Sequence, residues 1–85
     1  MKIKVYVKNG CPWCIELEAM LNKNGIEFER LMVTENPQLF HEMQNISDQN
    51  QAPTAVIDDK IFSNTDKEEI KSYLIEKGLI KLEAE

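Results

Sequence analysis

The sequence predicts an α/β fold in which helices pack on a four-stranded mixed sheet. Strand-like runs and helix-like apolar spacing alternate in the order βαβ, α, ββ, α. The 85 residues, 42% of them hydrophobic, suffice for one small core, so we expect a single domain over residues 1–85. Both cysteines, Cys11 and Cys14, stand where the first predicted strand passes into the first predicted helix.

The first part of the chain predicts a strand, a helix and a second strand. Residues 3–7 are strand-like, and residues 9–10 are a turn signal. From Cys14 onward, apolar residues recur at three- and four-residue spacing until the Asn-Gly stop at residues 24–25, which predicts an amphipathic helix of about three turns. Residues 26–33 are again strand-like. A unit of this length normally forms a parallel strand pair with a right-handed crossover.

A second helix and a polar loop follow. Asn36 and Pro37 suit the N-cap and the first turn of a helix. Apolar residues at helical spacing continue to residues 46–47, and residues 47–51 are polar throughout. Pro53 then stands at the entrance of the next strand. Because proline cannot donate to a sheet ladder, we expect it at an edge or a bend.

A β-hairpin and a last helix complete the predicted fold. Residues 54–57 and 61–63 form its strands, joined by a tight turn at residues 58–60. Thr65 or Asp66 caps the last helix, because each is followed three residues later by a glutamate. Gly78 ends this helix.

The charge and hydropathy of the sequence limit the classes of partner and the cellular compartment that we expect. The formal net charge is −5, whereas duplex binding relies on clustered Lys and Arg, so nucleic acid is not an expected partner. The N-terminal residues alternate charged and apolar side chains, unlike a signal peptide, and no later segment is apolar enough to span a membrane. We expect a cytoplasmic monomer whose cysteines cycle between thiol and disulfide.

The spacing of Cys11 and Cys14 predicts redox chemistry. On the first turn of a helix both sulfurs lie close enough to form a disulfide, and the free N–H groups and positive dipole end favour a thiolate. A thiolate is the nucleophile of disulfide exchange. Pro12 fits this turn because its missing N–H leaves no helical bond unmade.

Other uses of the two cysteines fit less well. A structural disulfide between them would close too short a loop to constrain the unfolded chain much. A structural zinc site needs four ligands, whereas the chain offers two cysteines and one distant histidine, His41, so we expect no metal. Two cysteines that serve only as small buried hydrophobic residues are a further alternative, weakened by the adjacent Pro12.

The element order, the Cys-x-x-Cys pair and the proline that opens the third strand resemble the thioredoxin fold, and specifically the small glutaredoxins. Lys8 precedes Cys11 by three residues, as a basic residue often does in that family, and Cys11-Pro12-Trp13-Cys14 is similar to its Cys-Pro-Tyr-Cys. The likeness extends over essentially the whole chain. It implies a thiol-disulfide oxidoreductase that reduces protein disulfides or glutathione mixed disulfides. In such an enzyme Cys11, the exposed member, attacks, and Cys14, nearer the core, or glutathione resolves the mixed disulfide.

The resemblance also implies a glutathione site. Pro53 corresponds to the family's cis-proline, which would turn the backbone of Ala52 toward the cysteines. The glutamyl end of glutathione docks near the start of the last helix in glutaredoxins, which implies Thr65 and Asp66 here. Lys8 is expected to meet the glycyl carboxylate. Alternatively, Pro53 is a trans proline, Asp66 is only a helix cap and Lys8 is a surface charge.

Around the reacting sulfur, the resemblance implies that Pro12 and Trp13 contact substrate. Trp13 would form an apolar wall beside the sulfur of Cys11, and Lys8 together with the helix end would favour its thiolate form.

Two features depart from the glutaredoxin pattern. Residues 51–53 are Gln-Ala-Pro where many glutaredoxins have Thr-Val-Pro, and residues 63–64 are Ser-Asn where they have Gly-Gly. Gln-Ala-Pro is similar to the NrdH-redoxins, electron donors of ribonucleotide reductase that thioredoxin reductase reduces, although these generally lack Pro-Trp between their cysteines. A second alternative is a glutaredoxin dimer that holds a [2Fe-2S] cluster through Cys11 of each chain and two glutathiones, which Pro12 disfavours.

Overall fold

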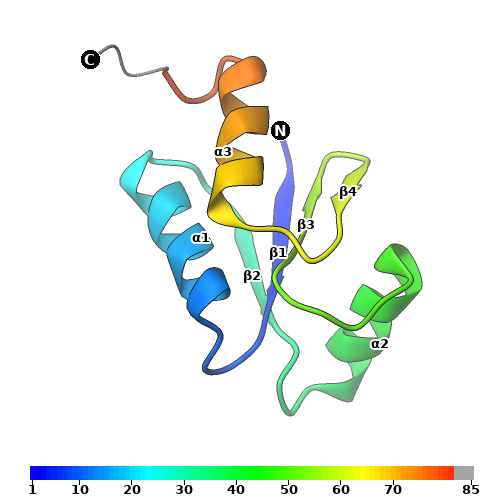
Figure 1. Ribbon diagram of the computed structural model, residues 1–85. Coiled ribbons are helices and arrows are strands. Elements are labelled where there is room, and N and C mark those ends of the chain that lie inside the picture. The colour runs from blue at the N-terminus through cyan, green and yellow to red at the C-terminus, as the bar shows by residue number, and fades with distance from the viewer. Residues whose placement is uncertain (82–85) are drawn as a thin grey trace.

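The computed structural model describes residues 1–81 and contains the predicted elements in the predicted order (Figure 1). These are β1 (Ile3–Val7), α1 (Pro12–Lys23), β2 (Glu29–Met32), α2 (Pro37–Ser47), β3 (Thr54–Ile57), β4 (Lys60–Phe62) and α3 (Lys67–Glu76). The expected domain boundary at residue 85 lies outside the described residues. Within residues 1–81, no helix has both the length and the apolarity that a membrane span requires.

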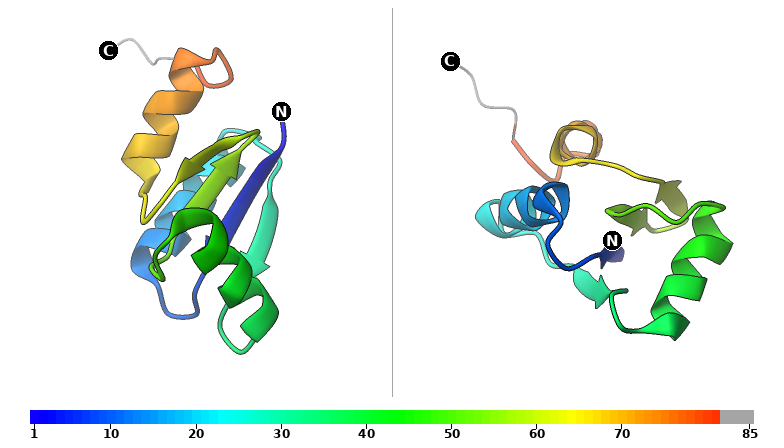
Figure 2. Two further views of the ribbon diagram at one scale, coloured as in Figure 1. Left: turned by 90° about the vertical axis from the view of Figure 1, so that its right-hand side faces the viewer. Right: turned by 60° about the horizontal axis from the view of Figure 1, so that its bottom comes forward.

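The strands form one mixed sheet in the order β2-β1-β3-β4. β1 and β2 are parallel, with Val5 opposite Arg30, while β3 runs antiparallel to both β1 and β4. Parallel neighbours need a crossover connection, and α1 supplies it. Helices α1 and α3 cover one face of the sheet and α2 covers the other (Figure 2). The predicted α/β fold with a four-stranded mixed sheet is therefore confirmed.

Alternation along β1 divides the core between the two faces of the sheet. On one face the strand packs against α1 and α3, in a cluster whose buried members include Ile3, Val5, Val7, Leu17, Leu21, Ile70 and Leu74. On the other face Tyr6 packs with Val33 and Met43 beneath α2. The larger cluster lies directly under the first helix, so it supports the segment that carries the cysteines.

The second strand is shorter than the predicted run over residues 26–33. Gly25 has φ 67° and closes α1, and the N–H of Ile26 donates to the carbonyl of Leu21 at 2.9 Å. A left-handed glycine followed by such a bond is a common helix ending. Because Ile26 completes the helix end, pairing with β1 begins only at Glu29.

The hairpin turn is also tighter than predicted. Lys60 pairs with Ile57, so β4 is Lys60–Phe62 instead of residues 61–63. The turn consists of Asp58 and Asp59, and Asp58 takes φ 53°. Aspartate tolerates this left-handed conformation better than most residues other than glycine.

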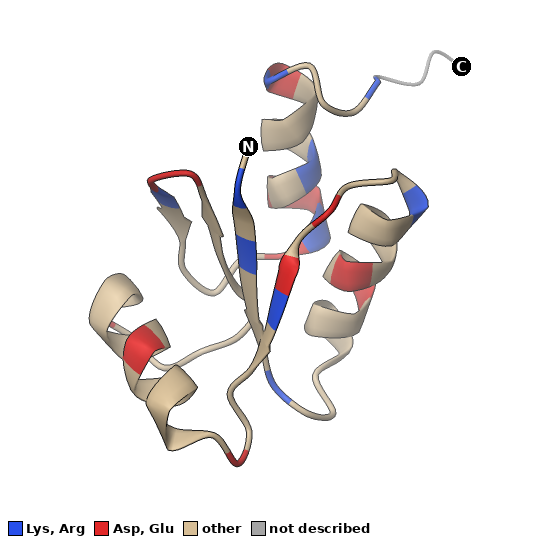
Figure 3. Cartoon of the chain, turned by 180° about the vertical axis from the view of Figure 1, so that it is seen from behind, with Lys and Arg blue, Asp and Glu red and all other residues tan. Residues whose placement is uncertain are grey.

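Acidic and basic residues are interspersed over the face opposite to that of Figure 1 (Figure 3). Two ion pairs join separate elements: Arg30 in β2 pairs with Glu18, and Lys67 in α3 lies 3.8 Å from Glu16. The Lys67–Glu16 pair is exposed on both sides, and pairs of this kind contribute about 0–1 kcal/mol each.

Candidate active site

Cys11 and Cys14 lie together at the N-terminus of α1, joined as a disulfide. Cys11 is the N-cap of the helix, and Pro12 lies in its first turn, as predicted. The Sγ of Cys11 accepts a hydrogen bond from the N–H of Cys14, with 3.2 Å between the two atoms. After reduction the same N–H would stabilise a Cys11 thiolate, because an anionic sulfur is the stronger acceptor.

The two cysteines differ in exposure. Cys14 is 1% exposed and belongs to the main core cluster, as expected for the member nearer the core. Cys11 is half-buried and packs at the edge of that cluster, so it is less exposed than predicted. The segment before β3 covers part of the Cys11 side chain, since the carbonyl oxygen of Ala52 lies 3.9 Å from the Cys11 sulfur. An external thiol or disulfide can therefore approach Cys11 but not Cys14.

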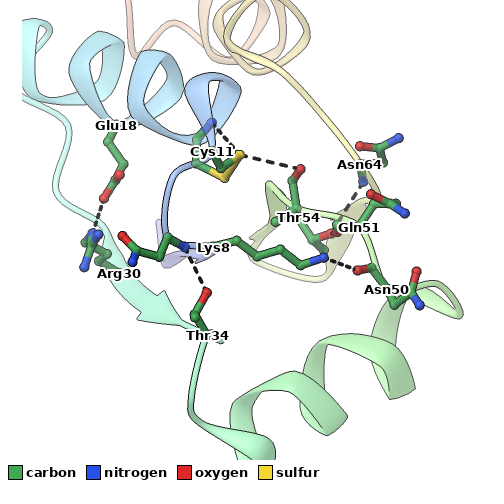
Figure 4. The surroundings of a disulfide bond; sticks show 12 residues. Lys8, Cys11, Glu18, Arg30, Thr34, Asn50, Gln51, Thr54 and Asn64 are labelled. Carbon is green, nitrogen blue, oxygen red and sulfur yellow. Dashed lines mark hydrogen bonds and ion pairs between the residues drawn. A yellow bond between two sulfur atoms is a disulfide. The ribbon is translucent and has the colours of Figure 1, made fainter.

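Lys8 extends away from the sulfurs toward the loop between α2 and β3 (Figure 4). Its Nζ donates to the carbonyl oxygen of Asn50 at 2.8 Å and lies 5.9 Å from the centre of the Phe40 ring. Nearby, the N–H of Asn9 donates to the hydroxyl of Thr34 at 2.9 Å. In this structure Lys8 thus ties the end of β1 to the loop, and its charge points away from the disulfide.

A pocket of about 390 Å³ opens beside the start of α1. Its lining consists of Trp13, Gln51, Ala52, Pro53, Asn64, Thr65 and Asp66. Five of the residues predicted to bind glutathione thus come together from three separate segments, whereas Lys8 and Pro12 are not part of the lining. The sequence analysis did not assign Gln51 and Asn64 to the site. Their sequence signals are that each adjoins a predicted site residue, Ala52 and Thr65 respectively, and that each belongs to a stretch that departs from the glutaredoxin pattern.

The segment opposite α1 forms the inner wall of this pocket. The Ala52–Pro53 peptide bond is cis, as the resemblance implies, and Pro53 is buried. The carbonyl of Pro53 accepts a hydrogen bond from the N–H of Thr65 at 2.8 Å. This bond connects the start of β3 to the loop before α3, which are two sides of the pocket.

Asp66 and Thr65 have different roles at the start of α3. Asp66 is the N-cap, and its Oδ1 accepts from the N–H of Glu69 at 2.9 Å. Thr65 is 5% exposed, and its hydroxyl donates to the carboxylate of Glu69. Of the two predicted caps, Asp66 is confirmed and Thr65 is wrong, because the Thr65 side chain is turned into the protein. Asp66 is exposed and brings a negative charge to the pocket.

Trp13 provides the outer wall of the pocket. Its side chain is 62% exposed although it is the largest apolar residue of the cysteine motif. Exposure of a large aromatic ring beside a reactive sulfur leaves apolar surface available to a bound partner.

On the far face of the sheet, a partly buried polar pair was not predicted. The hydroxyl of Tyr6 donates to the carboxylate of Glu42 in α2 at 2.5 Å. Burial and this hydrogen bond raise the pKa of Tyr6 well above its ordinary value. His41 in the same helix is exposed, and within residues 1–81 no group of three or more His, Cys, Asp or Glu side chains could hold a metal ion.

Comparison of the sequence with models of known protein families identifies the family that shares this arrangement. The glutaredoxin model matches residues 3–62, which include the cysteine pair and the cis-proline. The chain belongs to the glutaredoxin family. It is a thiol-disulfide oxidoreductase of that family, with Cys11 and Cys14 as its cysteine pair. The chain is 30% identical to Glutaredoxin 3 of Escherichia coli K12 over 56 residues, which are 66% of this chain and 68% of that relative.

Similar solved structures confirm the thioredoxin-like fold. The thioredoxin-like protein BC3987 is 25% identical with a TM-score of 0.76, over 84% of this chain and 97% of that chain. The NrdH-redoxin of Escherichia coli, a glutaredoxin-like protein with a thioredoxin-like activity profile, is 24% identical with a TM-score of 0.70, over 85% of this chain and 93% of that chain. At this identity the second likeness concerns the fold.

Proposed function

We propose that this glutaredoxin-family protein reduces glutathione mixed disulfides and protein disulfides, with Cys11 as nucleophile, Cys14 as resolving cysteine and glutathione as reductant. One observation carries the proposal: the half-buried Cys11 sulfur caps α1 and accepts the Cys14 N–H, while Cys14 lies in the core. The chain acts as one domain and one monomer over residues 1–85. Its compartment is the cytoplasm, where glutathione keeps such cysteines reduced.

The reaction proceeds through a mixed disulfide. The Cys11 thiolate attacks one sulfur of the substrate disulfide, a new S–S bond forms as the substrate bond breaks, and the leaving thiolate takes a proton from solvent. Cys14, deprotonated as it reacts, then attacks the Sγ of Cys11 and releases the second substrate sulfur as a thiol. Two electrons have passed to the substrate. Two glutathione molecules return them and leave as one glutathione disulfide.

The pocket supplies the surfaces that an extended peptide such as glutathione needs. The backbone of Ala52, beside the Cys11 sulfur, pairs with the peptide groups next to the reacting sulfur. The ring of Trp13, with Pro12 beside it in the first turn of α1, gives the bound peptide an apolar wall.

The charged ends of glutathione are assigned to two other places. The first N–H groups of α3 suit the glutamyl carboxylate, and the exposed carboxylate of Asp66 suits the neighbouring ammonium. Thr65, which is buried, forms the inner side of this part of the site at the start of α3. The ammonium of Lys8 keeps donors beyond its bond to Asn50 and suits the glycyl carboxylate.

The test is reduction of the mixed disulfide between glutathione and 2-mercaptoethanol, followed as NADPH consumption with glutathione and glutathione reductase present. The wild type should turn over, and Cys11→Ser should not. Absence of turnover by a folded wild-type protein whose disulfide is reducible by dithiothreitol would contradict the proposal.

A second candidate is an NrdH-like electron donor to ribonucleotide reductase. Asn64, which stands where many glutaredoxins have glycine, takes the left-handed φ of 48° and adds a side chain to the pocket lining. Gln51 lines the same pocket from the other side. Both side chains reduce the space for glutathione. Rapid reduction of the disulfide by thioredoxin reductase and NADPH, without turnover in the glutathione assay, would favour this candidate.

A further inference from the structure

The loop between α2 and β3 is organised by one side chain, that of Gln49. Its Oε1 accepts from the N–H of Gln51 at 2.6 Å, and its Nε2 donates to the carbonyl of Gln51 at 3.2 Å. The same Nε2 lies 2.8 Å from the hydroxyl of Ser47 and 3.0 Å from that of Thr54. These bonds take the place of a backbone ladder, so they hold both polar groups of the Gln51 backbone.

Thr54 extends this network to the opposite side of the pocket. Thr54 is fully buried, and its Oγ1 donates to the carbonyl of Gln51 at 2.8 Å (Figure 4). The same oxygen accepts from the N–H of Asn64 at 3.4 Å. Gln51 and Asn64 line the pocket from different segments. The Gln49 and Thr54 side chains, which are not part of the pocket lining, therefore connect two of the segments that line it.

In the segment held in this way, the backbone carbonyls on both sides of Gln51 contact residues of the β1–α1 region. The carbonyl of Asn50 holds the ammonium of Lys8, and the carbonyl of Ala52 faces the sulfur of Cys11. The disulfide itself is carried by α1 and by the core beneath it. A movement of the loop would therefore change the surface that meets substrate and leave the helix cap of Cys11 in place.

We propose that Gln49, acting through Thr54 and the Gln51 backbone, is a positioning residue for peptide disulfides. It holds the Ala52 backbone at the distance from Cys11 at which an attacking or attacked peptide disulfide is aligned. This inference rests on the proposed function, since it assigns the loop to the same site. Gln49 sets the alignment of a peptide substrate, and the intrinsic reactivity of the Cys11 thiolate does not depend on it.

The test compares two rate constants of the reduced protein. One is its oxidation by glutathione disulfide, a peptide substrate, and the other is alkylation of Cys11 by iodoacetamide, which needs no alignment by the loop. Gln49→Met keeps the side-chain length and removes all four hydrogen bonds. We expect the first rate constant to fall roughly tenfold, equivalent to about 1.4 kcal/mol, and the second to stay within about twofold of the wild type.

Two further variants complete the design. Gln38→Met is the matched control, because Gln38 is an exposed glutamine of α2 outside the pocket beside Cys11, and both of its rate constants should be those of the wild type. Gln49→Glu keeps the oxygen that accepts from Gln51 and loses both N–H donors. Its rate with glutathione disulfide should lie between those of the wild type and Gln49→Met, and it serves in place of the methionine variant if that variant does not fold.

Each result is decisive. The proposal is overturned if the ratio of the two rate constants in folded Gln49→Met or Gln49→Glu equals that of the wild type. This includes the case in which both rate constants fall in parallel, which would place the effect on Cys11 itself. A selective loss with glutathione disulfide supports it. If the wild type fails in the NADPH assay, the proposed function fails, yet the ratio is still measured and still decides whether Gln49 aligns peptide disulfides.

Discussion

The two walls of the active site are built in different ways. The wall that carries the disulfide is the first turn of a regular helix, in which Cys11 is the cap and the bond to the Cys14 N–H comes with the helix geometry. The wall opposite is the irregular segment around Gln51, where the side chains of Gln49 and Thr54 replace ladder hydrogen bonds. Local sequence positions the nucleophile, whereas contacts between distant segments position the surface that meets substrate.

This difference separates chemistry from recognition. Damage to the helix wall should abolish the reaction or unfold the domain, because the helix shares its core with most of the sheet. Damage to the loop wall should leave a reactive thiol that aligns its substrate poorly. Variants in the two walls therefore differ in the kind of loss and also in its size.

The largest effect is expected from the two cysteines of the helix wall. Cys11→Ser should lower turnover of any disulfide by roughly a thousandfold or more, because no mixed disulfide forms without the sulfur nucleophile. Cys14→Ser should keep turnover of a glutathione mixed disulfide, which glutathione can resolve, and lose most of its activity on a protein disulfide such as that of insulin. The NADPH assay measures both substrates, and equal losses in the two variants would be inconsistent with the assigned roles.

The core beneath the helix wall should give the next largest effect. Leu17 is fully buried under α1, so Leu17→Ala should lower the free energy of unfolding by about 2–5 kcal/mol. Ile15 in the same helix is 61% exposed, and Ile15→Ala should change it by less than about 0.5 kcal/mol. Urea unfolding followed by circular dichroism measures both, and similar losses in the pair would refute the described packing of α1.

Two helix caps sharpen the comparison, because only one of them adjoins the pocket. Asp66 caps α3 at the pocket, and Asn36 caps α2 away from it, and the side chain of each accepts a hydrogen bond from a backbone N–H of its helix. Replacement of either by alanine should cost about 1 kcal/mol of stability. Only Asp66→Ala should also raise KM for the glutathione mixed disulfide, by about threefold to tenfold as one charged contact is lost. A similar KM in both variants would reduce Asp66 to a cap.

The smallest effect is expected at alkaline pH on the face away from the disulfide. Because the pKa of Tyr6 is raised in the folded state by burial and by the bond to Glu42, this residue contributes stability that is fully present below its unfolded value near 10. That contribution is lost as the pH rises above about 10. Tyr6→Phe should cost about 1 kcal/mol at pH 7 and show a weaker alkaline decline than the wild type in urea unfolding. Parallel declines would show that Tyr6 does not contribute.

Most of the fold could be predicted because its signals are local. Strand β1, the cap and first turn of α1, and the Asn36-Pro37 start of α2 each depend on residues adjacent in sequence. The late start of β2 could not be predicted, because it depends on the N–H of Ile26 being used to close α1.

The candidate active site also has features that could be predicted from the sequence and features that could not. The cysteine pair and its neighbours at the pocket follow from motif and resemblance. The direction of Lys8 and the network of Gln49 do not, since both depend on contacts between segments far apart in the chain. In sequence, Gln49 is one of several polar residues in a loop, and nothing distinguishes it until Thr54 and Gln51 are placed beside it.

Because Cys14 is buried beneath the first turn of α1, a partner from solution can be joined to the protein only through Cys11. In a Cys14→Ser variant no second sulfur is present to expel that partner, so the adduct persists until a small thiol arrives. The variant is therefore a covalent bait. Recovered from cells after acid quenching and analysed by mass spectrometry, it would carry the natural partners of the protein, each attached at the cysteine that it offers for reduction.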